Sequence, residues 1–152
     1  MALTGYISTS ALAPTLRNTP GPTTSEYNRV IVQYATATVA VGTLNTLYNM
    51  MVLPKNAVVV QAWIRSADID GDASPTVVLA LGDSGDDDRL VTGYTGGQTG
   101  AAAAGTLAHT GLGYKYTADT LIQLKLTTAA ATIASGAVVC GVAYFVDNAA
   151  TT

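Results

Sequence analysis

The sequence predicts an all-β fold, a jelly-roll-like β-sandwich of about eight strands that follows an extended N-terminal arm. Three observations predict this class. Short runs of β-branched, aromatic and small residues alternate with turn signals from residue 29 onward. A helical period of three to four residues is nowhere sustained over a dozen positions. The strands are unequal and one connection is long, which favours Greek-key crossings over the uniform hairpins of an up-and-down barrel.

The arm is predicted to comprise residues 1–27, and the β-sandwich domain residues 28–152. Three prolines, Pro14, Pro20 and Pro22, lie in the arm, which shows neither a helical nor a strand period. A disordered tail is the alternative interpretation, because chain termini are loose unless contacts hold them. The arm residues expected to bind a partner are four spaced apolar residues and one basic residue: Tyr6, Ile7, Leu12, Leu16 and Arg17.

Eight segments are expected as strands because they are rich in β-branched and aromatic residues. They are residues 30–39, 47–53, 57–65, 76–81, 89–94, 114–116, 120–127 and 136–146. Residues 95–113 are rich in Gly and Ala and are expected to form a long loop, with at most a weak helical turn at residues 101–104. Within the strands, we expect Trp63 to anchor the core and Cys140 to be a small buried hydrophobic residue.

Residues 127–146 form an uncharged run of about the length that crosses a membrane. Thr, Ser and Gly dilute its hydropathy, so we expect a loop followed by a buried strand, and no membrane partner. Residues 1–10 lack the basic and continuous apolar segments of a secretory signal.

Composition limits the function further. Only 11% of the 152 residues are charged, against about a quarter in an ordinary soluble domain, so we expect much of the surface to be buried against other subunits. The net charge of −3 argues against a nucleic-acid partner, because binding to phosphates depends on Lys and Arg. A single Cys excludes a disulfide scaffold within the chain. With one His, one Cys and one Glu, the chain is expected to be neither an enzyme nor a cofactor-binding protein.

The sharpest chemical feature is an acidic segment in which Asp68, Asp70 and Asp72 surround Gly71. Alternating carboxylates supply the hard oxygen ligands that calcium prefers. The match to an EF-hand loop is partial, because Gly71 stands fourth instead of sixth and no Glu occupies the twelfth position. We therefore favour a turn whose carboxylates accept backbone N–H groups over a metal site formed by Asp68, Asp70 and Asp72.

A second acidic loop spans residues 82–89 and contains three consecutive Asp residues. We expect a solvated tip. The alternatives are that this loop adds metal ligands beside the first acidic segment, or that Arg89 pairs with one of its carboxylates. His109 has no Ser, Cys or carboxylate at a recognisable spacing, so no catalytic or metal-binding role is expected for it.

Two blocks of the sequence, residues 51–92 and 113–147, carry a resemblance to a known family. The first contains a strand that opens on LPKNAVVV and the turn GDSGDDDR; the second contains GYKYTADTLIQLKL and a closing strand that ends in FVD. In this order they resemble small structural proteins of tailed bacteriophages that are often encoded beside the major capsid protein. The resemblance implies a capsid decoration, or cement, protein with a β-sandwich fold on the outside of an icosahedral shell. The arm and residues 95–112 lie outside it.

The expected function is therefore that of a structural virion protein on the outer capsid surface, made in the host cytoplasm. Its expected partners are the major capsid protein, whose neighbouring subunits it would clamp, and its own symmetry mates as a homo-oligomer. The alternative is a tail- or fibre-associated β-module that recognises a cell-surface glycan, with calcium held by the three carboxylates of the first acidic segment.

Overall fold

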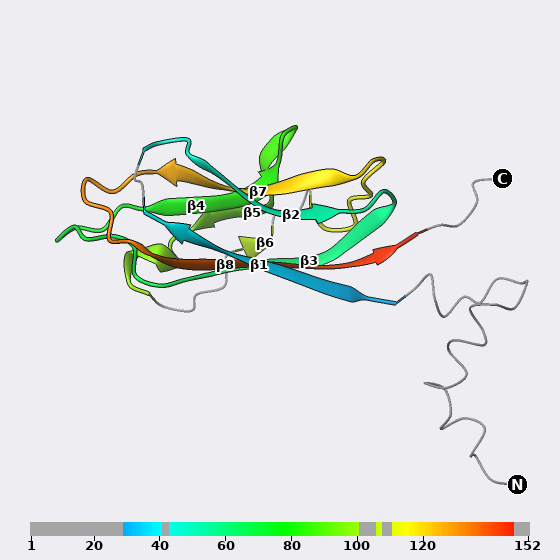
Figure 1. Cartoon of the computed structure of the whole chain (residues 1–152), viewed down its shortest axis with the longest axis horizontal. Coiled ribbons are helices and arrows are strands. Elements are labelled where there is room, and N and C mark those ends of the chain that lie inside the picture. The colour runs from blue at the N-terminus through cyan, green and yellow to red at the C-terminus, as the bar shows by residue number, and fades with distance from the viewer. Residues whose placement is uncertain (1–28, 41–42, 101–105, 108–110, 148–152) are drawn as a thin grey trace, which may run out of the picture.

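The computed structural model describes residues 29–40, 43–100, 106–107 and 111–147. The arm residues Tyr6, Ile7, Leu12, Leu16 and Arg17 lie outside the described residues, as do the expected helical turn at 101–104 and His109. In the described part, two antiparallel sheets pack face to face, so the predicted β-sandwich is confirmed (Figure 1). The strands are β1 (Ile31–Val39), β2 (Leu47–Leu53), β3 (Ala57–Ser66), β4 (Val78–Asp83), β5 (Asp86–Tyr94), β6 (Thr106–Leu107), β7 (Thr120–Thr128) and β8 (Gly136–Val146).

The strand order is that of a jelly roll. One sheet has the order β1-β8-β3 and the other β2-β7-β4-β5-β6. Residues 113–116 extend the first sheet beside β3, where Val58 and Lys115 form an antiparallel bridge and the Tyr116 N–H donates to the Ala57 carbonyl. With this segment as the fourth member of the first sheet, the chain passes between the sheets in the order of two Greek keys. The predicted strand at 114–116 is therefore a short edge segment.

The largest differences from the predicted bounds concern β4 and β5, which begin at Val78 and Asp86 instead of residues 76 and 89. Asp83 pairs with Asp86 across a tight turn at residues 84–85, and its carboxylate accepts the backbone N–H groups of Gly85 and Asp86. The carboxylate thereby holds the turn, and the acidic residues that follow belong to a strand. The helical turn that the structure describes is a 3-10 turn, η1 (Gly96–Gln98).

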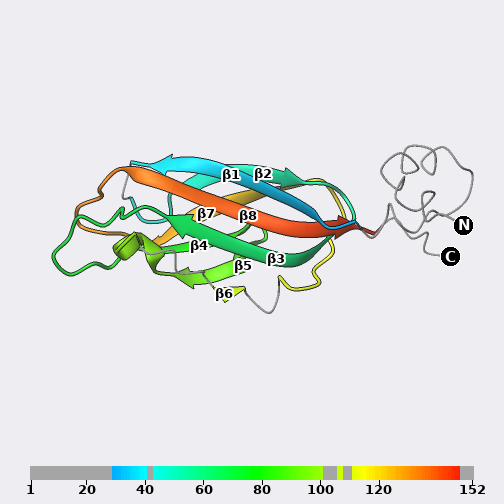
Figure 2. The same ribbon diagram turned by 90° about the horizontal axis from the view of Figure 1, so that it is seen from below.

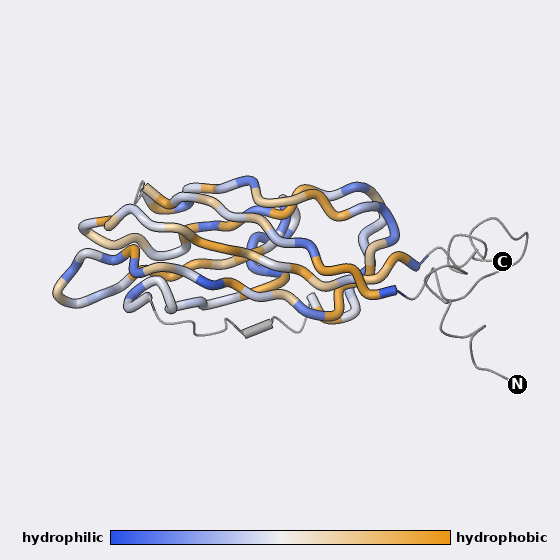
Figure 3. The backbone as a smooth tube through the Cα atoms, turned by 60° about the horizontal axis from the view of Figure 1, so that its bottom comes forward, coloured by the Kyte–Doolittle hydropathy of each residue, from blue (hydrophilic) through white to orange (hydrophobic). Residues whose placement is uncertain are grey.

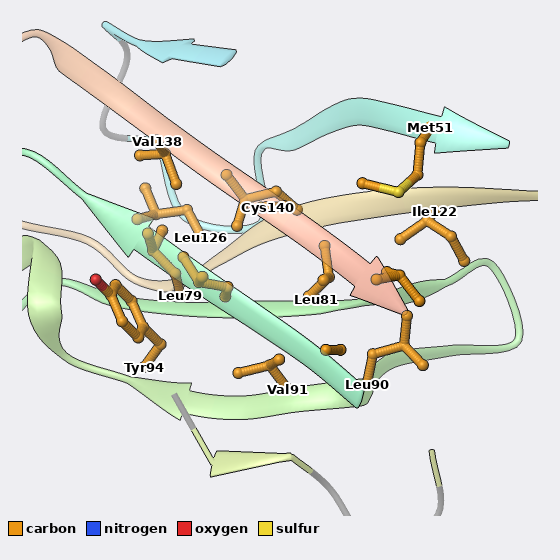
Figure 4. Close-up of a cluster of buried hydrophobic side chains, with 14 of the residues drawn as sticks. Met51, Leu79, Leu81, Leu90, Val91, Tyr94, Ile122, Leu126, Val138 and Cys140 are labelled. Carbon is orange, nitrogen blue, oxygen red and sulfur yellow. The ribbon is translucent and has the colours of Figure 1, made fainter. Parts of the chain in front are cut away.

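The core lies between the two sheets and is formed by alternate residues of each strand. Along β7, Ile122, Leu124 and Leu126 are fully buried, whereas Leu121 is exposed on the other face. Cys140 lies among these side chains as predicted, and burial raises the pKa of its thiol to about 12, so it stays protonated at neutral pH. Figure 4 shows side chains from both sheets meeting in this core: Met51, Leu79, Leu81, Leu90, Val91, Tyr94, Ile122, Leu126, Val138 and Cys140.

The uncharged run at residues 127–146 ends in β8, the central strand of the first sheet. This is the buried strand that was expected there. Across the described ranges, no helix is long and apolar enough to cross a membrane.

Both ends of the described chain lie at the same end of the sandwich. Ile31 pairs with Tyr144 and Val39 with Gly136, so β1 begins where β8 finishes (Figures 1 and 2). We call this the terminal end; the β4–β5 turn lies there too. The loops between β3 and β4 and between β7 and β8 lie at the opposite end, which we call the loop end.

Candidate functional site

The candidate site is the face of the β1-β8-β3 sheet that points away from the core, which we call the outer face. Figure 2 views this sheet with its three strands side by side. Strand register and alternation place the following residues on it: Val32, Tyr34, Thr36 and Thr38 of β1, Ala137, Val139, Gly141 and Ala143 of β8, and Gln61, Trp63 and Arg65 of β3. Arg65 is the one charged residue among them, so this face is nearly uncharged.

Trp63 lies across Gly141 in the middle of the outer face. The two residues are paired across β3 and β8, and a Cβ atom on Gly141 would come within 2.0 Å of the indole ring. The glycine therefore makes room for the ring. Tyr34 pairs with Gly141 from the other side, so two aromatic residues flank the glycine.

This position corrects the expectation that Trp63 anchors the core. Its neighbours Ala62 and Ile64 are buried, and strand alternation therefore turns the half-buried indole outward. The sequence contained a signal for this. Gln61, Trp63 and Arg65 are alternate residues and so share one face of the strand, and two of them are polar residues that belong on an exposed face.

Hydrophobic residues are exposed at the start of β1. The exposed fractions of Val30, Val32 and Tyr34 are 52%, 56% and 71%. Figure 3 shows this hydrophobic stretch where the chain emerges from the grey N-terminal trace. Scattered single exposures are ordinary, but adjacent ones form the kind of apolar patch that is typical of binding surfaces.

The outward face of the other sheet is different, because its polar side chains bind one another. The Gln123 side-chain amide donates to the Asn49 side-chain oxygen at 2.8 Å, and Lys125 forms an ion pair with Asp87. Three exposed apolar residues are exceptions on this face: Leu47, and the paired residues Val52 and Leu121. Paired polar groups suit a face that stays in water, so the outer face of the β1-β8-β3 sheet is the better candidate for an interface.

A buried carboxylate organises the terminal end. Asp83 Oδ2 accepts hydrogen bonds from Arg89 Nε at 2.7 Å and from the Tyr116 hydroxyl at 3.1 Å. The Arg89 guanidinium lies 4.1 Å from the centre of the Tyr114 ring, which meets the Tyr116 ring edge to face. The alternative prediction for this loop, pairing of Arg89 with a carboxylate, is confirmed. The expected solvated tip is wrong for Asp83. This residue is buried, and its carboxylate holds the turn and binds Arg89.

The electrostatics of this cluster are those of a structural ion pair. Burial of the Asp83 carboxylate would by itself raise its pKa, but the hydrogen bond from Arg89 and the Gly85 N–H hold the pKa below its usual range. Burial and the nearby Asp83 charge raise the pKa of Tyr116. At neutral pH the cluster therefore contains a carboxylate, a guanidinium and a protonated phenol.

The first acidic segment joins the two loops of the loop end. Asp70 Oδ2 accepts the backbone N–H groups of Thr76 at 2.6 Å and Val77 at 2.7 Å. Asp72 accepts those of Ala131 at 2.7 Å and Thr132 at 2.9 Å, which belong to the loop before β8. The carboxylates thus accept hydrogen bonds from backbone N–H groups that have no strand partner in these loops.

The remaining carboxylate of this segment, Asp68, accepts the backbone N–H of Asp70 at 3.1 Å. Burial would raise the pKa of Asp70, but its three backbone N–H partners lower it below the usual range. Within the ranges that the structure describes, no three or more His, Cys, Asp or Glu side chains gather where they could hold a metal ion. The preference for a turn over a metal site at Asp68, Asp70 and Asp72 stays a prediction.

Comparison with known proteins relates the chain to phage capsids. A chain of the capsid asymmetric unit of cyanophage Pam1 is 29% identical, with 77% of this chain and 84% of that chain covered and a TM-score of 0.69. A chain of the Ralstonia phage GP4 capsid is 23% identical, with coverage of 86% and 92% and a TM-score of 0.69. A chain of the acid-stable capsid of Helicobacter pylori bacteriophage KHP30 is 17% identical, with coverage of 79% and 94% and a TM-score of 0.55.

The last two likenesses show the shared fold. No protein-family model matches the sequence, and no curated protein matches it.

The lowered pKa values of Asp70 and Asp83 predict the pH dependence of stability. Both carboxyls bind protons more weakly in the folded chain than in the unfolded chain, where the pKa of Asp is about 3.9. Their contribution to the free energy of unfolding is therefore present above that pKa and is lost as the pH falls through their folded values. Urea titrations at a series of pH values should show the free energy of unfolding falling steeply below about pH 4.

Asp70→Asn should have a lower free energy of unfolding than the wild type at neutral pH. On acidification, its free energy of unfolding should fall by less than that of the wild type. Asp119→Asn is the control at an exposed position, where the carboxylate accepts one backbone N–H, from Lys55, in place of the three that Asp70 accepts; it should change the pH profile less than Asp70→Asn does. An Asp70→Asn profile parallel to the wild type would contradict this assignment.

The contact between Trp63 and Gly141 predicts the effect of a larger residue at position 141. Gly141→Val should displace the indole and lower the free energy of unfolding by about 2 kcal/mol. Because Trp63 is the chain's one tryptophan, the same variant should shift its fluorescence to longer wavelength. Ala137→Val adds bulk at an exposed position of the same strand and should change neither reading; equal effects of the two variants would refute the contact's importance.

Proposed function

We propose that the protein is a structural component of a phage virion that binds the outside of an icosahedral capsid and clamps neighbouring major capsid subunits. The observation that carries this proposal is the structural likeness to a Pam1 capsid chain over most of both chains. The nearly uncharged outer face supports it, because such a face suits burial against another protein.

The clamp would act through buried area. A shell subunit that covers the outer face would remove Tyr34, Trp63 and the small residues of β8 from water. Opening the shell would return that surface to water, at a cost of about 25 cal/mol for each Å² of apolar area. Arg65 would orient the contact by pairing with an acidic or carbonyl group of the partner.

The arm would extend the clamp. It joins β1 at the terminal end, directly beside the exposed residues Val30 and Val32. We propose that Tyr6, Ile7, Leu12, Leu16 and Arg17 bind an adjacent subunit, with the prolines limiting the entropy lost on binding.

The tail-module alternative gains no specific support from the structure. Its calcium ligands would be Asp68, Asp70 and Asp72. All three carboxylates accept backbone N–H groups, those of Asp68 and Asp70 from their own loop and that of Asp72 from the loop before β8.

Charge added to the outer face should prevent attachment. Thr36→Glu with Gln61→Glu places two carboxylates on this face, where burial against a shell would strip them of water. We expect at least a tenfold loss of binding to shells that lack the protein, measured by co-sedimentation. Asn49→Glu with Thr128→Glu adds the same charge to the other sheet and should bind like the wild type. Unchanged binding of the outer-face variant would contradict the proposal.

Removal of residues 1–27 should separate folding from attachment. The remaining chain retains both sheets and the core, so its melting temperature should be almost unchanged. Its binding to shells should be weaker than that of the full chain in the same co-sedimentation assay. If the truncated protein binds as tightly, the arm has no part in the clamp; if it fails to fold, the boundary at residue 27 is wrong.

A further inference from the structure

The edges of the two sheets differ sharply in how they are protected. An edge strand exposes backbone N–H and C=O groups to which another strand can pair, and proteins usually blunt such edges with bulges, charges, prolines or short strands. The second sheet ends in β2 and β6: β2 has a register shift between Asn49 and Met51, and β6 has two residues. The first sheet ends beside β3 in residues 113–116, a short segment with one bridge.

The remaining edge, β1, carries none of these protections. Its nine residues pair with β8 in unbroken register, from Ile31 opposite Tyr144 to Val39 opposite Gly136. The strand contains no proline and no charged residue. Val30, Val32 and Tyr34 are exposed along it. A long, regular and apolar edge is a pairing site, and leaving it open would favour aggregation.

We propose that β1 pairs antiparallel with β1 of a second copy of this chain across a two-fold axis. The two three-stranded sheets would join into one continuous sheet of six strands, in the order β3-β8-β1-β1-β8-β3. In a two-fold contact, residue i of one copy faces residue j of the other, and like residues meet at the axis. Because β1 has no charged residue, it can pair in this way at any register without like-charge repulsion.

The side chains of β1 also suit this contact. Pairing that keeps both cores on the same side of the joined sheet sets the outer-face residues of one copy beside those of the other. These residues are Val32, Tyr34, Thr36 and Thr38, which are aromatic and β-branched. Such residues form the favourable cross-strand pairs of antiparallel sheets. The two outer faces would become one wider, nearly uncharged surface.

The pairing has a geometric consequence for the proposed clamp. Because the two β1 strands run in opposite directions, the terminal ends of the copies lie at opposite ends of the joined sheet. The two arms would therefore start far apart and point to different neighbours. Only this placement on the virion rests on the proposed function; the pairing itself is tested in solution, without capsids.

Cross-linking locates the contact. Cys140 is buried and is the chain's one cysteine, so an introduced surface cysteine is the reactive thiol. Tyr34→Cys, Thr36→Cys and Thr38→Cys, treated one at a time with a short bis-maleimide, should give a covalent dimer in at least one case. Gln61→Cys lies on the same outer face but on β3, away from the proposed contact, and it should give no covalent dimer, and neither should the wild type. No dimer above the Gln61→Cys level at any β1 position would overturn the proposal.

Sedimentation equilibrium tests the association itself. At about 100 µM, the full chain should sediment as a dimer, and Val32→Lys with Tyr34→Lys should raise the dissociation constant at least about 100-fold. Gln61→Lys is the control and should remain dimeric, while far-ultraviolet circular dichroism confirms that each variant is folded. A monomeric wild type, or a dimer that survives the two lysines, overturns the proposal. Dimerisation only after removal of residues 1–27 overturns it too, because the arm would then occupy the β1 edge.

Discussion

Strand alternation in a two-layer sandwich is the constraint on which the rest of this structure depends. Each strand buries one row of side chains between the sheets and turns the other row outward. The inner rows are mostly apolar, as Ile122, Leu124 and Leu126 of β7 illustrate. The outward side chains are not constrained by the core, and in this protein they differ between the two sheets. One presents polar side chains that bind each other, and the other presents small, aromatic and uncharged side chains.

The few charges of the chain support this difference by lying mostly at the two ends of the sandwich. At the loop end, Asp70 and Asp72 accept backbone N–H groups of the loops they join. At the terminal end, Asp83 holds the β4–β5 turn and binds Arg89 and Tyr116. Carboxylates thus fix the loops where no strand partner is available. On the outer face, strands β1, β8 and β3 carry one charged residue, Arg65, and the ion pair of Lys115 with Asp147 lies at the edge beside β3.

The sequence predicted the class of fold and most strands because alternation and turn residues are local signals. The bounds of β8, residues 136–146, agree with the prediction. The start of β5 at Asp86 was not predictable in this way, since Asp is unfavourable in strands. Arg89, three residues on, pairs with Asp86, but the partner of Asp87 is Lys125 of the distant strand β7. The outward position of Trp63 follows from its alternation with Ala62 and Ile64, but the room for its ring comes from Gly141, which lies far along the chain and could not be recognised as its partner from the sequence. The small number of charged residues predicted that some surface is buried against a partner. Which surface that is, and the fact that β1 is an edge strand, can be seen only from the strand order.

The number of copies in each virion tests the central claim most directly. A quantified gel of purified virions gives the ratio of this chain to the major capsid protein. A protein that clamps shell subunits over the whole capsid must be present in a fixed ratio to them, with copies in the hundreds. A few to tens of copies, the number expected of a tail or fibre component, would contradict the account.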